Sequence, residues 1–178
     1  MKKNSFIFMI LIFLIFSSCS LKYDTKKVSQ DATPEFIFEK PLFKRIEDGN
    51  KTVIINADKI EKYNKDSTFY ANNVYFETFD EEEQTLSKGF SGLLFANMDA
   101  QLFELYDKIN LYSKDFEANF SANALRWNGK TEQLTGSKND TVRIEKNDTI
   151  LYGTGFSAST VTNTFNFSGT VTGEIEEK

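Results

Sequence analysis

The chain has 178 residues and a mass of 20.4 kDa, which suits one domain plus a leader and is too short for two ordinary cores with a linker. It contains no histidine and one cysteine, which excludes histidine-based acid–base catalysis, His/Cys zinc sites, disulfide scaffolds and paired-thiol redox chemistry. The formal charge of −5 argues against a basic nucleic-acid-binding patch, so we expect no nucleic-acid partner. Eighteen residues are phenylalanine, so this small domain buries a large apolar surface or presents it to an apolar ligand.

Residues 1–18 have the organisation of a lipoprotein signal peptide. Two lysines form a positive n-region, and Phe6–Phe16 is an unbroken apolar run. As a helix this run is about 16 Å long, roughly half the hydrocarbon core of a bilayer. Two serines then precede Cys19, as in the cleavage site of bacterial lipoproteins, so the sequence predicts lipidation of Cys19. An ordinary signal peptide with an accidental cysteine and an uncleaved anchor are the alternatives.

The segment after the leader, residues 19–35, is polar and charged and ends close to Pro34, which favours a tether. From Phe36 to Lys178 the pattern changes to short period-two segments separated by Asn, Asp, Gly and Lys. Turn signals spaced by roughly ten residues are typical of an all-β domain, and no segment predicts a helix of three turns. The predicted strands include Val53–Ile55, Phe69–Phe79, Leu102–Tyr112, Phe116–Ala122, Val142–Ile144, Ile150–Tyr152 and Thr164–Val171. The predicted turns are Asp48–Asn50, Asn64–Asp66, Asn128–Lys130, Lys138–Asp140 and Asn147–Asp148.

A weak repeat accompanies this pattern. Ala57–Ile60 and Ala122–Leu125 each precede a turn that contains Asn and Lys, and each leads to a second strand, ending at Val74–Phe76 or Val142–Ile144. Such a repeat fits a meander that adds hairpins along one axis.

Enzymatic motifs are weak in this sequence. The Gly153–Gly155 pair lacks the strand and helix that flank a phosphate-binding loop, so we interpret it as a strand bend. Asp80–Glu83 lacks the alternating ligands of a calcium loop and is either a solvated loop or the start of a short helix. No carboxylate pair stands out for glycoside hydrolysis. We therefore expect no enzymatic activity, no metal and no cofactor.

Five short motifs after Phe116 occur in a distinctive order: an Ala-x-x-Leu-x-Trp strand, Leu-Thr-Gly, Val-x-Ile, Ile-x-x-Gly-x-Gly-Phe and a closing strand with Gly-x-Val. They occupy Ser121–Asn128, Leu134–Gly136, Val142–Ile144, Ile150–Phe156 and Thr164–Val171. In order and spacing they resemble the LptC family, the membrane-attached periplasmic subunit of the lipopolysaccharide transport machine. The resemblance covers roughly Val53–Gly173.

The resemblance implies an open antiparallel β-taco, or β-jellyroll, of two facing sheets whose apolar interior takes lipid acyl chains. One face of each predicted strand is apolar, which agrees with a trough but also with a closed sandwich core. The candidate lipid-binding residues are Phe103, Leu105, Ile109, Leu111, Phe120, Leu125, Trp127, Val142, Ile144, Phe165 and Phe167. The candidate cations at the rim of the trough are Lys108, Lys114, Arg126 and Arg143.

The resemblance also implies partners and a location. The ligand is lipopolysaccharide or a related glycolipid, an LptA-like bridge protein joins the C-terminal edge, and an inner-membrane LptB/LptF/LptG-like transporter supplies the energy. The predicted partner edge is Thr164, Phe165, Asn166, Phe167, Ser168, Gly169, Thr170 and Val171. We expect a periplasmic domain anchored by an N-terminal lipid, with the inner membrane favoured.

Two alternatives remain from the sequence. One is a non-transport β-sandwich lipoprotein with a structural or surface-binding role, in which the core is closed. The other places the domain with LptA or the periplasmic part of LptD, against which the lipid anchor and the lack of a large barrel argue, respectively.

Overall fold

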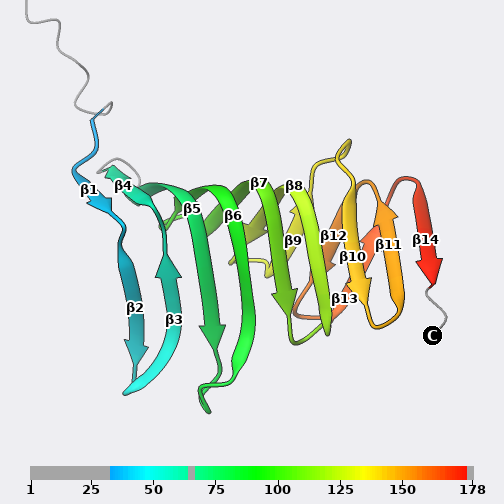
Figure 1. Ribbon diagram of the computed structural model, residues 1–178, viewed down its shortest axis with the longest axis horizontal. Helices are drawn as coiled ribbons and strands as arrows, with labels where there is room; N and C mark the ends of the chain where they lie inside the picture. The colour runs from blue at the N-terminus through cyan, green and yellow to red at the C-terminus, as the bar shows by residue number, and fades with distance from the viewer. Residues whose placement is uncertain (1–32, 64–66, 176–178) are drawn as a thin grey trace, which may run out of the picture. The chain divides into compact units, whose positions relative to one another are not determined.

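The computed structural model describes residues 33–63 and 67–175, and every regular element in these ranges is a β-strand (Figure 1). This confirms the predicted all-β fold. The signal peptide, Cys19 and the predicted turn Asn64–Asp66 lie outside the described residues. The strands are β1 (Phe36–Glu39), β2 (Leu42–Glu47), β3 (Asn50–Asn56), β4 (Lys59–Tyr63), β5 (Thr68–Phe79), β6 (Thr85–Asn97), β7 (Leu102–Ser113), β8 (Ala118–Asn128), β9 (Gln133–Gly136), β10 (Val142–Lys146), β11 (Thr149–Gly153), β12 (Phe156–Ser159), β13 (Thr164–Phe167) and β14 (Val171–Ile175).

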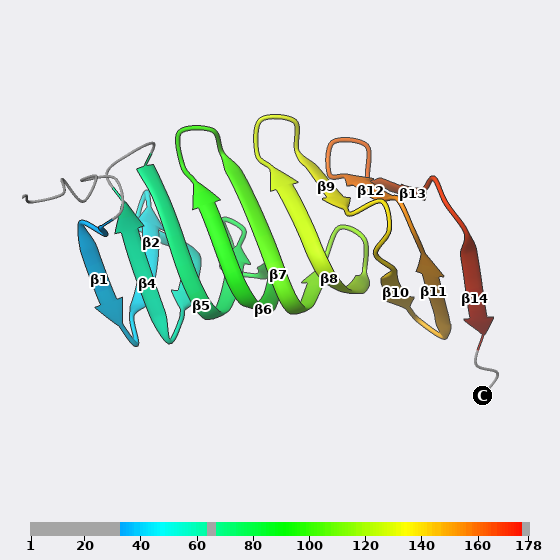
Figure 2. The same ribbon diagram turned by 90° about the horizontal axis from the view of Figure 1, so that it is seen from above.

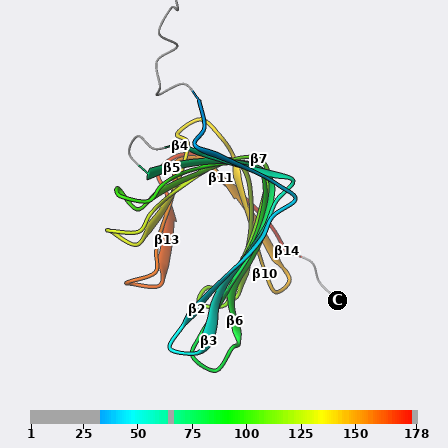
Figure 3. The same cartoon turned by 90° about the vertical axis from the view of Figure 1, so that its left-hand side faces the viewer.

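All of these strands belong to one antiparallel sheet, which bends along a line across its strands to give two arms. Pairing in the first arm follows the order β1-β4-β5-β6-β7-β8-β9-β12-β13. In the second arm it follows β2-β3-β5-β6-β7-β8-β10-β11-β14. The four long strands β5 to β8 run through both arms, whereas the other strands each belong to one. Figure 3, seen from the β1 end, shows the two arms diverging from the bend, and Figure 2 shows the strands stacked along the sheet. The two facing sheets that the family resemblance implies are therefore the arms of a single open sheet.

The bend is built into the backbone of the long strands. In β5, Asn73 has φ 48°, and in β7 two consecutive residues, Asp107 and Lys108, have φ 63° and 51°. The strand register shifts at the same level in β6 and β7. Gly92 faces Asp107 there, and a Cβ on Gly92 would lie 2.6 Å from an oxygen of the Asp107 carboxylate. A side chain at position 92 would displace the Asp107 side chain, so the glycine lets the two strands turn together with Asp107 in place.

The sequence pattern misplaces parts of two strands and misses several others, of which β6 is the longest. β6 is absent from the predicted strands because two glycines and the shift at the bend break its alternation. The strand predicted at Phe116–Ala122 begins too early, since Lys114–Glu117 is a turn closed by the Glu117 N–H and the Lys114 carbonyl (3.1 Å).

The predicted strand and partner edge Thr164–Val171 is wrong as one element. Thr164–Phe167 forms β13 in the first arm, and β14 of the second arm begins only at Val171. Between them, the Ser168 N–H donates to the Gly155 carbonyl and the Gly169 N–H donates to the Thr154 carbonyl, each at 3.1 Å. These hydrogen bonds carry the chain around the bend, so the C-terminal edge of the sheet consists of two strands rather than one.

Three connecting segments agree with what the sequence predicts. Asp48 and Gly49 both have positive φ, 51° and 88°, which is the geometry of a type I′ hairpin between β2 and β3. Asp80–Glu83 is an exposed loop between β5 and β6, not a helix. The Gly153–Gly155 segment is a bend between β11 and β12, where Gly155 has φ 64°.

Candidate functional site

The inner faces of the two arms carry continuous rows of apolar side chains. Strand pairing aligns these residues, because directly opposed residues in a sheet point to the same face. The row in the first arm is Phe38, Ile60, Ala71, Leu94, Leu105, Leu125 and Gly136. The row in the second arm is Phe43, Ile55, Phe76, Gly89, Leu111, Phe120, Ile144, Leu151 and Gly173. Together these rows line an apolar trough that runs across the sheet from β1 and β2 toward β13 and β14.

The structure brings all of the sequence-predicted ligand residues onto this inner face. Seven of them are buried: Leu105, Ile109, Leu111, Phe120, Leu125, Val142 and Ile144. The other four are partly buried: Phe103, Trp127, Phe165 and Phe167. Their strands are β7, β8, β10 and β13, so they come from the middle and the C-terminal end of the trough.

The N-terminal end of the trough escapes prediction from the sequence. Inner-face residues of β5 are odd-numbered before the bend, at Phe69 and Ala71, and even-numbered after it, at Val74 and Phe76. The alternation therefore changes phase at Asn73, and a single period-two pattern fails across the strand. In β7 the bend takes up two residues instead of one, so Phe103 and Leu111 keep the same parity and the face is easily recognised.

The trough is more exposed at its N-terminal end. The buried cluster there, Ala57, Ile60, Ala71 and Val74, lies within three residues of the bend. Farther out, Ala96 on the inner face of β6 is still buried (4% exposed), whereas Phe36 and Phe43 on the first strands are 49% and 43% exposed. The buried cluster at the C-terminal end is larger and extends to Phe116, which lies in the turn at the free end of the second arm.

The predicted rim cations are already paired or lie elsewhere. Lys108 sits at the bend, the closed side of the trough, so its prediction as a rim residue is wrong. Lys114, at the free end of the second arm, lies 3.4 Å from Asp80. Arg126 pairs with Glu104, and Arg143 pairs with Glu145 at 2.8 Å. The hydrogen bond to Glu145 raises the pKa of Arg143, so this guanidinium keeps its charge.

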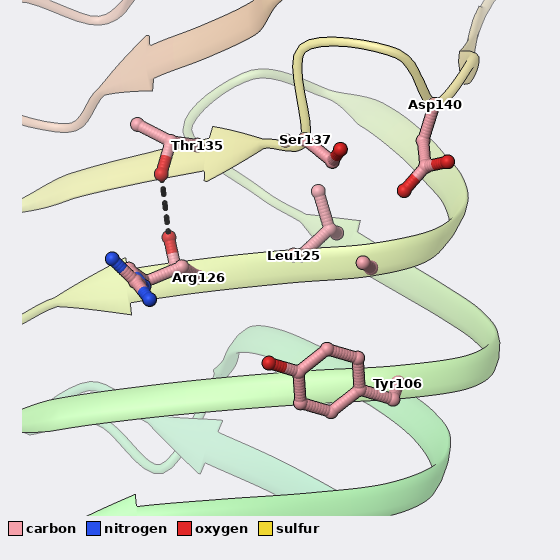
Figure 4. Close-up of a pocket in the computed structure, with 8 residues that line it drawn as sticks. Tyr106, Leu125, Arg126, Thr135, Ser137 and Asp140 are labelled. Carbon is pink, nitrogen blue, oxygen red and sulfur yellow. Dashed lines mark hydrogen bonds between the residues drawn. The ribbon is translucent and has the colours of Figure 1, made fainter.

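A pocket lies in the first arm at β7, β8, β9 and the loop after β9 (Figure 4). It has a volume of about 430 Å³, and its lining includes Tyr106, Arg126, Thr135 and Asp140 together with Leu125 and Gly136 of the inner-face row. The Thr135 hydroxyl donates a hydrogen bond to the Arg126 carbonyl (3.5 Å) at its wall. Its lining brings together no arrangement of catalytic side chains, so we place the candidate site in the trough.

Neither a metal centre nor a membrane-spanning helix is found in residues 33–63 and 67–175. No group of His, Cys, Asp or Glu side chains in these ranges is arranged to hold a metal ion. No helix there has the length and hydropathy needed to cross a bilayer.

Comparison with known proteins agrees with this architecture. The chain is 22% identical over 155 residues to an uncharacterized protein of Treponema pallidum (strain Nichols), an alignment that covers 86% of this chain and 78% of the relative. The family model described as "Lipopolysaccharide-assembly, LptC-related" matches residues 5–176. Since that match spans nearly the whole sequence, the protein belongs to the LptC-related family of lipopolysaccharide assembly.

Proposed function

We propose that this protein is a membrane-anchored periplasmic component of a lipopolysaccharide or glycolipid transport machine, and that its trough receives lipid acyl chains and passes them to a bridge protein. The family takes part in lipopolysaccharide transport. The observation that carries the finer proposal is the apolar inner face, which continues through every strand pairing from β2 to β14 in the second arm.

The physical basis is the cost of exposing lipid chains to water. That cost is about 0.8 kcal/mol per CH₂, or on the order of 10 kcal/mol for a chain of fourteen carbons. A trough lined by Phe, Leu, Ile and Val side chains removes much of the cost without any covalent chemistry. The direction of transport then comes from the energy supplied by a partner ATPase.

A photocrosslinking experiment tests the trough. Phe103 and Leu102 are neighbours in β7, are both apolar and partly buried, and face opposite sides of the sheet. With p-benzoylphenylalanine in place of Phe103, we expect the full-length protein in native membranes to form a lipid adduct that mass spectrometry detects. The same crosslinker in place of Leu102 is the matched control and should yield no adduct. Equal capture at both positions would show nonspecific adsorption and defeat the trough.

Anchoring through Cys19 is part of the same proposal. The support is its place as the sole cysteine, directly after the apolar run of the leader. Several acyl chains on one cysteine hold a protein firmly at a membrane, whereas a single chain binds reversibly. We expect Cys19→Ala to abolish metabolic labelling with a radioactive or clickable fatty acid. Unchanged labelling of this variant would contradict lipidation at Cys19.

Partner contacts complete the proposal. The sheet ends in β1 and β2 on one side and in β13 and β14 on the other, and in the described residues these strands each pair along one edge only. Unpaired strand edges are suited to strand addition by another chain. We assign the β13 and β14 edge to an LptA-like bridge protein and the β1 and β2 edge to the periplasmic part of the inner-membrane transporter.

A further inference from the structure

Five phenylalanine rings form a closed loop of contacts at the C-terminal end of the trough. In spatial order around the loop the rings are Phe116, Phe120, Phe156, Phe167 and Phe165. The centroids of neighbouring rings are 5.6 to 6.4 Å apart. We call this set the phenylalanine ring. Such centroid separations are those of favourable edge-to-face and tilted aromatic pairs.

Two contacts of the phenylalanine ring cross from one arm to the other. Phe120 in β8 of the second arm touches Phe156 in β12 of the first arm, with centroids 5.7 Å apart. Nearer the free ends, Phe116 of the second arm touches Phe165 in β13 of the first arm at 6.4 Å. The arms are thus joined both near the bend and near the mouth of the trough.

The fifth ring, Phe167, also contacts the opposite arm, because Gly153 has no side chain to block it. Gly153 is the last residue of β11 in the second arm, and a Cβ there would lie 2.5 Å from the Phe167 ring of the first arm. Phe167 therefore packs directly onto the backbone of the opposite arm. Phe116, Phe120 and Phe156 are all less than 9% exposed, so this end of the trough is filled by the protein's own side chains.

The N-terminal end lacks a comparable closure. Of the ring contacts in the described residues, only Phe38 with Phe43 joins the two arms there, and both lie within two residues of the Lys40–Pro41 connection at the bend. On the inner faces of β1 to β6, Ala96 near the end of β6 is buried (4% exposed), but Phe36 and Phe43 on the first strands are 49% and 43% exposed. An acyl chain that enters here meets no aromatic contact between the free ends of the arms in the described residues.

We infer that the phenylalanine ring is a gate: acyl chains bind first in the N-terminal part of the trough and reach the C-terminal edge only when the Phe116–Phe165 and Phe120–Phe156 contacts part. The inference rests on the proposed function, since it concerns how the same trough is used. A gate of this kind holds cargo until a partner at the C-terminal edge separates the arms, and it keeps that end of the trough dry between cargoes.

The single tryptophan makes the gate measurable. Trp127 lies on the inner face of β8 in the first arm, whereas Leu151 lies on the inner face of β11 and packs against the buried cluster that contains Phe116, Phe120 and Phe156. The probe is dibromostearic acid, whose bromine atoms quench indole fluorescence on contact, added to the purified full chain in maltoside micelles. We expect strong quenching of Trp127 in the parent protein. In the Trp127→Phe/Leu151→Trp variant we expect several-fold weaker quenching.

Opening the gate should remove this difference. Phe165→Ala, which truncates a partly buried ring, should raise quenching in the Leu151→Trp background to the level of Trp127. If Phe165→Ala does not fold, Phe116→Leu is the second variant, since it keeps apolar volume but loses the ring contacts. It should raise the quenching in the same way. The matched control is Phe95→Ala, which removes an aromatic contact with Tyr70 on the outer face and should change neither signal.

The outcomes separate the gate from the function on which it rests. No quenching of Trp127 in the parent would defeat lipid binding by the trough itself. Quenching of Trp127 together with equal quenching in the Leu151→Trp variant would leave the trough intact and overturn the gate. Folded gate variants that leave the Leu151→Trp signal weak would also overturn it.

Discussion

Ser91 is the polar side chain that lies fully buried among the residues that the structure describes. It occupies the point in β6 where the register with β7 shifts. Its hydroxyl donates toward the Leu93 carbonyl (2.6 Å) and the Tyr106 carbonyl (3.0 Å), and it accepts the Tyr106 N–H at 3.2 Å. The side chain thereby supplies partners for backbone groups that the bend removes from the regular ladder.

We predict that Ser91→Ala destabilises the protein by about 1–3 kcal/mol, because the Tyr106 N–H loses the buried hydroxyl that accepts its hydrogen bond. Urea unfolding of the purified protein measures the difference. Ser121→Ala is the control, since Ser121 is partly exposed and meets only Asn110 at 3.3 Å, and we expect less than about 0.5 kcal/mol for it. Similar losses in both variants would mean that Ser91 has no special part in the bend.

Asp80 organises the loop at the free end of the second arm. One oxygen of its carboxylate accepts the backbone N–H of Gln84 (2.8 Å) and of Glu82 (3.0 Å), while the other faces Lys114 at 3.4 Å. The hydrogen bond from Gln84, helped by Lys114, lowers the pKa of Asp80 below its ordinary value of 3.8. A lowered folded-state pKa stabilises the fold above pH 3.8, and this stabilisation disappears as the pH falls through the folded-state value.

We therefore predict that Asp80→Asn, which keeps the acceptor oxygen and removes the charge, lowers the melting temperature at pH 7. The gap between the two proteins should shrink as the pH falls below 3.8 and through the lowered pKa of Asp80 in the folded state, because the aspartate itself then becomes neutral. Differential scanning fluorimetry across this pH series measures the gap, so that acid effects common to both proteins cancel. A gap that stays constant with pH would exclude charge as its source.

At the scale of single strands, local alternation predicts a strand well only where the bend leaves its phase unchanged. In β7 the bend inserts Asp107 and Lys108 as a pair, so the apolar face from Phe103 to Leu111 could be recognised from sequence. In β6 the alternation of inner-face residues changes phase at Gly92, so the same pattern does not predict this strand. The Ala57–Ile60 and Ala122–Leu125 repeat has a structural basis: in each, a polar residue at the bend separates an inner-face alanine from an inner-face Ile or Leu. Contacts between the arms, such as the phenylalanine ring, depend on the bend and have no signature within one strand.

The contact between β11 and β13 gives a test at this scale. We predict that Gly153→Ala destabilises the fold by about 1–3 kcal/mol, because the added methyl group meets the Phe167 ring. Adding Phe167→Leu should recover part of that loss, because the smaller side chain leaves room for the methyl group. A double-mutant cycle in urea should therefore give a coupling energy that stabilises the double variant relative to the sum of the single effects. Gly129→Ala is the control, since the nearest atom to its new Cβ is a Gln101 side-chain carbon at 3.2 Å. Additive effects at Gly153 and Phe167 would show that Phe167 does not pack across the trough as described.

At the scale of the whole sheet, the two ends have different chemistry. The N-terminal edge exposes large apolar side chains on both faces, among them Phe36 on the inner face (49%) and Ile37 on the outer face (51%). Uncovered apolar strand edges are prone to aggregation, which favours a partner there. The C-terminal edge consists of β13 and β14, and every residue of β14 is exposed. Each end offers two strands, one per arm, so a similar two-armed sheet could extend both arms together.

We predict that removing residues 171–178, and with them β14, abolishes binding of the bridge protein while the contact with the transporter survives. Without β14 the second arm ends at β11, one strand short of the first arm, so a two-armed partner cannot pair with both arms at once. The fold should persist, because the deletion leaves the phenylalanine ring intact and removes only exposed residues from the described part of the chain. The measurement is co-purification of each partner with the full-length or truncated protein from solubilised membranes, with circular dichroism to verify folding. Lys130→Glu, a charge change in the turn between β8 and β9, is the control and should retain both partners. A folded, truncated protein that still brings down the bridge protein would show that the C-terminal edge is not its docking site.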